Sequence, residues 1–112
     1  MGSDANSFIP RSLRFALNVP VVLYLRDHMA SGRSINVSDS GMLVRFDQTL
    51  EIWLKGHLCV VAGEWHLSID VHIIRVEGQL TALAYEIGSE GDRATIRKLI
   101  ELADHNLAAP AA

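Results

Sequence analysis

The chain has 112 residues, of which 49% are hydrophobic and 21% charged; this suits one domain with one core and excludes an intrinsically disordered protein. Its net charge of −3 argues against a protein that coats nucleic acid or an acidic membrane. Its single cysteine, Cys59, excludes an internal disulfide, and no apolar run approaches the roughly 18 residues of a membrane helix. We therefore predict a cytoplasmic protein without direct membrane insertion.

The two ends of the chain differ from its middle. Residues 1–10 show no hydrophobic periodicity, and we interpret them as a flexible N-terminal arm or a remnant of expression cloning. Residues 11–106 are predicted to form one folded domain. The Ala- and Pro-rich residues 107–112 are predicted to be a tail or the start of a linker.

Short runs rich in β-branched residues begin at Val19 and are separated by turn residues. Residues 27–32 and the pair Glu77-Gly78 are predicted to be hairpin turns. Six strands are predicted, at residues 19–26, 33–38, 42–46, 57–62, 64–76 and 79–87.

Two of these runs predict which side chains share a face. In residues 33–38, alternation places Ile35 and Val37 on one face, and Asn36 with Ser38 on the other, polar face. In residues 64–76 the register slips at Ile73-Ile74, which predicts a β-bulge. The apolar face of this long strand is predicted to contain Trp65, Leu67, Ile69, Val71 and Ile73.

After Gly88 the apolar period becomes helical, and Ser89 or Asp92 can cap the start of the helix. Strands joined by tight turns and followed by one helix predict a mostly β fold, a six-stranded antiparallel β-barrel with a C-terminal α-helix packed on it. The buried stripe of this helix is predicted to contain Ile96, Leu99, Ile100, Ala103 and Leu107.

The chain contains no phosphate-binding glycine loop, nucleophile elbow or paired-cysteine metal motif. On the predicted strand 64–76, His66 and His72 would lie about 20 Å apart, so only Asp70 could share an ion with His72. We interpret these residues as a solvated polar face and Cys59 as a buried, inert thiol. We predict no enzymatic activity, no catalytic residue, no cofactor and no bound metal.

Five positions suggest a binding function. Arg11 and Arg14 precede the first strand, and Asn36, Ser38 and Gly41 form the pattern N-x-S-x-x-G at the end of the second. With the six strands and the closing helix, this pattern resembles the PilZ domain family, whose signature is R-x-x-x-R followed by [D/N]-x-S-x-x-G. The resemblance covers residues 11–103, nearly the whole chain.

The resemblance implies that the protein binds cyclic di-GMP, a bacterial second messenger, through Arg11, Arg14, Asn36, Ser38 and Gly41. The residue types suit such a ligand, because arginine can bind guanine edges and phosphates or stack on a base. The amide of Asn36 and the hydroxyl of Ser38 can add hydrogen bonds, and Gly41 permits a close approach of the backbone. Binding would order the N-terminal arm and signal to a protein partner or a fused domain.

The first element departs from the family pattern, because Pro10 stands where the first arginine belongs and Arg11 follows one place late. The alternative is therefore a degenerate PilZ-like protein-interaction module that does not bind the nucleotide. A small barrel that binds single-stranded nucleic acid needs exposed aromatic residues along a basic groove. The tryptophans, Trp53 and Trp65, are expected in the core instead, and the acidic net charge also argues against DNA or RNA as a partner.

Overall fold

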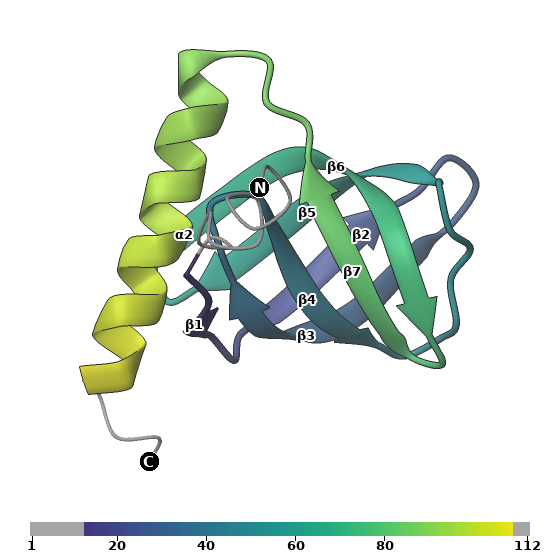
Figure 1. The fold of residues 1–112 in the computed structure, drawn as a ribbon, viewed down its shortest axis with the longest axis horizontal. Helices are drawn as coiled ribbons and strands as arrows, with labels where there is room; N and C mark the ends of the chain where they lie inside the picture. The colour runs from purple at the N-terminus through teal and green to yellow at the C-terminus, as the bar shows by residue number, and fades with distance from the viewer. Residues whose placement is uncertain (1–12, 109–112) are drawn as a thin grey trace, which may run out of the picture.

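The computed structural model describes residues 13–108 and shows a small antiparallel sheet followed by one helix (Figure 1). No helix in the described part of the chain combines the length and the apolar character needed to cross a membrane. The elements are β1 (Phe15–Ala16), β2 (Pro20–Tyr24), β3 (Met29–Val37), β4 (Gly41–Phe46), β5 (Lys55–Ala62), β6 (Trp65–Glu77), β7 (Leu80–Tyr85) and α2 (Glu90–Ala108).

Six of the strands close into a barrel, which confirms the predicted fold class. The sheet runs β3-β2-β5-β6-β7-β4, and a further antiparallel pairing of β4 with β3 joins its two ends. Closure removes the exposed strand edges that a short open sheet would leave. The two-residue strand β1 pairs with β3 outside this ring and was not predicted.

The first hairpin turn is shorter than the sequence predicts. Residues 27–32 were expected to form the turn, but β3 already begins at Met29, and the Leu25 N–H donates to His28 O at 2.8 Å. The reason is the pairing of Leu23 with Ala30, because both side chains point into the barrel and are fully buried. Burial of Ala30 therefore extends the strand into a stretch whose residue types favour a turn.

Two β-bulges change the register of the sheet. The bulge predicted at Ile73-Ile74 is confirmed, because the pairing of β6 with β7 shifts between Ile73 and Arg75. A second bulge, between Ser34 and Asn36 in β3, was not predicted. Each bulge inserts one residue and so reverses the alternation of side chains beyond it.

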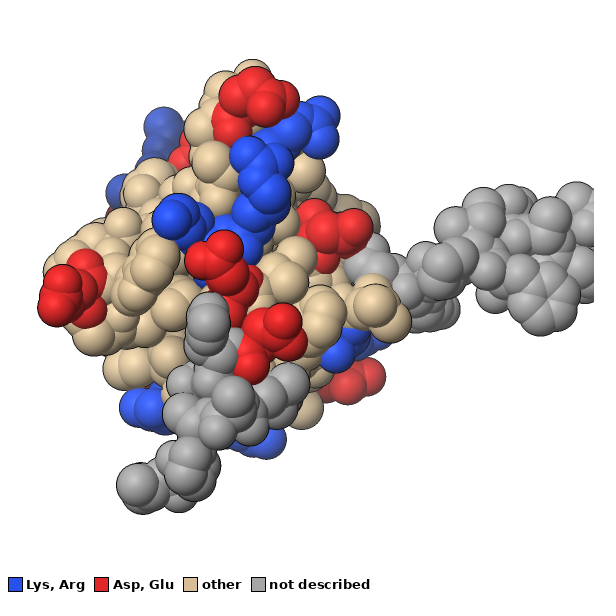
Figure 2. All heavy atoms as spheres, turned by 90° about the vertical axis from the view of Figure 1, so that its left-hand side faces the viewer, with Lys and Arg blue, Asp and Glu red and all other residues tan. Residues whose placement is uncertain are grey.

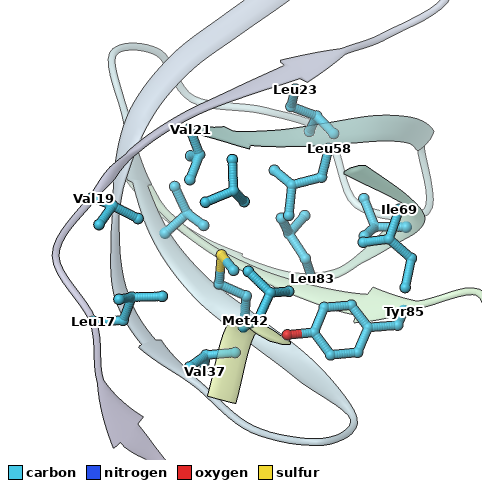
Figure 3. Packing of buried hydrophobic residues seen from close by; sticks show 14 of the residues in the cluster. Leu17, Val19, Val21, Leu23, Val37, Met42, Leu58, Ile69, Leu83 and Tyr85 are labelled. Atoms are coloured by element: carbon cyan, nitrogen blue, oxygen red, sulfur yellow. The ribbon is translucent and has the colours of Figure 1, made fainter. Parts of the chain in front are cut away.

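The barrel interior holds one continuous apolar core, to which every strand of the ring contributes (Figure 3). The segment between β1 and β2 also contributes, because Leu17 and Val19 are buried there. The buried hydroxyl of Ser34 holds this segment in place, since it donates to Leu17 O at 2.5 Å and accepts from Val19 N at 3.0 Å. The chain from residue 17 onwards is therefore part of the folded domain.

Helix α2 lies along one side of the barrel, next to β1, and contacts β1, β3 and β6 (Figure 1). The predicted stripe is confirmed for the described side chains, because Ile96, Leu99 and Ala103 are buried and Ile100 is half-buried. The side chain of Leu107 lies outside the described residues. The predicted cap is also present: Ser89 Oγ accepts from Asp92 N at 3.2 Å, and Asp92 Oδ2 accepts from Gly88 N at 2.8 Å.

Candidate functional site

The structure brings together two of the predicted site residues from different parts of the chain. Ala16 of β1 pairs with Asn36 of β3, which places Arg14 beside that residue on the outer wall of the barrel. The Arg14 Nη1 group donates to Asn36 Oδ1 at 2.7 Å. The arginine is exposed and the asparagine half-buried, so both side chains remain accessible from solvent.

Ser38 lies at a different depth from the one predicted. It was expected on the same polar face as Asn36, but it is fully buried, because β3 ends at Val37 and Ser38 begins the turn that leads into β4. Its Oγ accepts from the backbone N–H groups of Ser40 and Gly41, each at 3.2 Å. Its own N–H donates to Gly41 O at 2.9 Å. Ser38 thus holds together the turn between β3 and β4.

Gly41 is needed at its position because another strand approaches closely. A Cβ atom there would lie 2.1 Å from Leu83 O, and Gly41 pairs directly with Ala84 of β7. Glycine had been expected here because it permits a turn conformation that brings the backbone close to the ligand. Among the described residues, however, the glycines with a positive φ are Gly63 and Gly78. The glycine requirement thus comes from barrel closure in this structure.

Arg11, the remaining predicted site residue, lies outside the described residues. The site that the structure describes therefore consists of Arg14 and Asn36 on the barrel wall, with the turn formed by residues 38–41 beside them.

Tyr85 lies beneath this site and was not singled out by the sequence. Its ring packs among the core side chains near Met42, and its backbone N–H donates to Ser40 O at 3.0 Å (Figure 3). Burial raises the pKa of Tyr85 well above its usual range. The charge of Arg14 has a smaller, opposing effect, and the Asp39 carboxylate adds to the increase. Within the described part of the chain, its buried hydroxyl has no hydrogen-bond partner.

Sequence reasoning also missed two further arginines on the outer wall. Arg33 of β3 and Arg45 of β4 are directly paired across the strands, and both are exposed. In the sequence they were only two members of a basic N-terminal half. No sequence pattern indicated them, because the β3 bulge that places Arg33 on the same outer face as Asn36 is decided by strand pairing.

Two histidines of the barrel, His57 and His72, pair with carboxylates rather than cluster around a metal position. His57 Nδ1 lies 2.7 Å from Asp70 Oδ1, and His72 is paired with Glu86. No group of three or more metal-ligating side chains occurs among residues 13–108. Cys59 is half-buried rather than fully buried, and desolvation raises the pKa of its thiol, which disfavours the nucleophilic thiolate.

The expectation that both tryptophans lie in the core is wrong. Trp53 is 68% exposed and Trp65 is 37% exposed, and Lys98 Nζ lies 4.5 Å from the centre of the Trp65 ring. Trp53 lies in a loop with φ of 75°, outside the strands whose alternation suggested burial. Basic and acidic side chains are interspersed on the face that carries α2 (Figure 2), without a continuous basic groove for nucleic acid there.

Comparisons with known proteins agree with this architecture. The model of the PilZ domain family matches residues 9–102. A solved PilZ domain of CeSA from a cellulose-synthesizing bacterium superposes with a TM-score of 0.74 at 18% identity, covering 84% of this chain and all of that one. The PilZ domain of YcgR from Escherichia coli, solved with c-di-GMP, has a TM-score of 0.74 at 11% identity, covering 88% of this chain and 94% of the other.

Among curated protein sequences, no significant match to this chain was found. The family assignment therefore depends on the family model, which spans most of the chain, and on the barrel with its C-terminal helix. On this basis, the chain belongs to the PilZ domain family.

Proposed function

We propose that this protein is a receptor for cyclic di-GMP, bound on the outer wall of the barrel by Arg14 and Asn36 with Arg11, Ser38 and Gly41. The observation that carries the proposal is the 2.7 Å hydrogen bond from Arg14 Nη1 to Asn36 Oδ1, which joins two motif elements 22 residues apart. Further support comes from the similar PilZ domain of YcgR, which was solved with this nucleotide.

The chemistry of the pair suits this ligand. A guanidinium has five N–H donors, and the contact with Asn36 occupies only one of those of Arg14. The remaining donors can bind a phosphodiester or the O6 and N7 atoms of guanine, and the planar group can stack on a base. The amide NH2 group of Asn36 is a further donor beside it. Such a site binds and orients a ligand, and the proposed role is therefore recognition without catalysis.

The proposed response to the ligand is ordering of residues 1–12. Arg11 lies in this segment, and a nucleotide held at Arg14 would bring it onto the barrel wall. The signal would pass to a protein partner or a fused domain. The contacts of β1 support this proposal, because β1 follows Arg14 directly and contacts both β3 and α2.

Isothermal titration calorimetry with cyclic di-GMP tests the binding site. Wild-type protein is expected to bind, and Arg14→Ala and Asn36→Ala are each expected to raise the Kd by roughly tenfold or more, because each removes charged or polar contacts to the ligand. Arg26→Ala is the matched control, since this exposed arginine lies in the turn at the other end of β3.

Absence of heat from the wild type at saturating nucleotide would overturn the proposal. The degenerate protein-interaction module would then be the better interpretation, and a protein partner captured by the wild type should also be captured by Arg14→Ala.

Amide hydrogen exchange tests the ordering step. Saturating cyclic di-GMP is expected to slow the exchange of amides within residues 1–12, because docking of the segment protects them from solvent. Arg11→Ala should bind more weakly and show less of this protection. Unchanged exchange in residues 1–12, together with shifted NMR resonances at Asn36, would show that the ligand binds without ordering the segment.

A further inference from the structure

Two arginines oppose each other on the outer wall of the barrel. In the antiparallel register, Arg33 of β3 lies directly across from Arg45 of β4, and both side chains are exposed. Like charges placed directly opposite each other on neighbouring strands destabilise a sheet. The stability of the sheet therefore gives no reason for this pair.

The bulge in β3 places this pair on the same face as Asn36. Simple alternation would put residues 33 and 36 on opposite faces, but the register shift after Ser34 inserts one residue between them. Their partners on β4, Arg45 and Leu43, are two residues apart, which corresponds to roughly 7 Å along a strand. The arginine pair is thus a close neighbour of the Arg14–Asn36 contact.

The two guanidinium groups also share one depression without a counter-ion. An open depression of about 400 Å³ is lined by Arg33 and Arg45, with Asn18, Ser34 and Ile35. Arg33 is oriented by Asn18, because its Nε donates to Oδ1 at 2.7 Å and its Nη2 to the backbone oxygen at 3.3 Å. Of the carboxylates in residues 13–108, none forms an ion pair with either arginine.

We propose that Arg33 and Arg45 form a second anion-binding position, which takes one of the two phosphodiesters of the bound nucleotide. This inference rests on the proposed function. Cyclic di-GMP carries two phosphodiesters separated by ribose, so a second cationic position can bind the phosphodiester that Arg14 does not contact. A guanidinium oriented by a neutral amide keeps its full charge for an anion, and phosphate oxygens accept paired N–H groups from arginine.

Calorimetric titration of the full chain with cyclic di-GMP tests this second position. Arg45→Gln is the primary variant, because the Arg45 side chain is exposed and forms no ion pair with the described residues. It is expected to raise the Kd roughly tenfold, whereas Arg45→Lys, which keeps the charge but loses the paired N–H donors, should raise it by less. Arg26→Gln is the control for a general loss of positive charge and should leave the Kd unchanged.

Thermal unfolding should show that Arg45→Gln is at least as stable as the wild type, since it relieves the like-charge pair.

The outcomes separate this inference from the proposed function. If the wild type binds, Arg14→Ala loses binding and Arg45→Gln binds like the wild type, the second position is wrong and the proposed function remains. If the affinity lost in Arg45→Gln is the same at low and at high salt, the contact does not depend on charge and the assignment to a phosphate is overturned. A wild type that does not bind the nucleotide would overturn both.

Discussion

The hydroxyl of Ser38 is fully buried and holds the turn that precedes β4. It accepts from the N–H groups of Ser40 and Gly41, so the serine supports the site from below. Arg14 and Asn36 differ from it, because their side chains remain accessible on the outer wall. At the scale of single residues, the described motif positions therefore differ: Arg14 and Asn36 are accessible from solvent, whereas Ser38 and Gly41 shape the backbone beside them.

Tyr85 provides a test of burial at the residue scale. Its hydroxyl is buried without a partner in the described structure, so Tyr85→Phe should leave the free energy of unfolding unchanged or raise it by up to about 1 kcal/mol at neutral pH. Urea denaturation measures this difference. A loss above about 1 kcal/mol would show that the hydroxyl has a hydrogen-bond partner.

The same tyrosine predicts a pH dependence. Because burial raises its pKa in the folded state above its value in the unfolded chain, its contribution to stability is complete below about pH 10 and is lost as the pH rises further. Between about pH 8 and pH 11, Tyr85→Phe should gain on the order of 1 kcal/mol relative to the wild type. An unchanged difference between the two proteins would show that the phenol ionises equally well in both states.

At the scale of the elements, close contacts between strands determine where glycine is required. Gly41 has no room for a Cβ atom, because Leu83 O of β7 would lie 2.1 Å from it. Gly78 has open space around it but a φ of +63°, in the turn between β6 and β7. One glycine is required by space and the other by conformation.

These two glycines give a matched pair of variants. Gly41→Ala should destabilise the protein by about 2–4 kcal/mol, because the β4–β7 pairing must separate to admit the methyl group. Gly78→Ala should cost about 1–2 kcal/mol, the strain of a left-handed residue in open space. Equal losses of stability in thermal unfolding would contradict this distinction.

At the scale of the whole molecule, the helix is an integral part of the domain. The buried faces of Leu99 and Ala103 pack where α2 meets β1, β3 and β6, and the segment that carries Leu17 fills the same core. The proposed site lies on β1, β3 and β4, so the helix contacts two of the elements that position it.

Truncation of Leu99 tests this arrangement. Leu99→Ala should lower the free energy of unfolding by about 2–4 kcal/mol, because it leaves a cavity between helix and barrel. Arg97→Ala, an exposed position on the same helix, is the control and should change it by less than about 0.5 kcal/mol. If the two variants lost the same stability, the helix would not be packed on the barrel in solution.

Much of the fold followed from local pattern. Alternation with a period of two, turn residues and a final helical period predicted six strands, the barrel and the helix, and even the bulge in β6. The motif also predicted that Arg14 and Asn36 lie together, as the structure shows. These signals are local, because the period of the apolar residues reports which face of each element is buried.

Other features depended on contacts between segments far apart in the chain. The bulge in β3 decides that Arg33 shares a face with Asn36, and the turn after Val37 buries Ser38. The exposure of Trp53 is likewise decided by where the rest of the chain packs. The sequence by itself determined the kind of each element and most inward-facing residues. Only the tertiary structure decided register and proximity, because hydrogen bonds between strands that are distant in sequence select the face each residue presents.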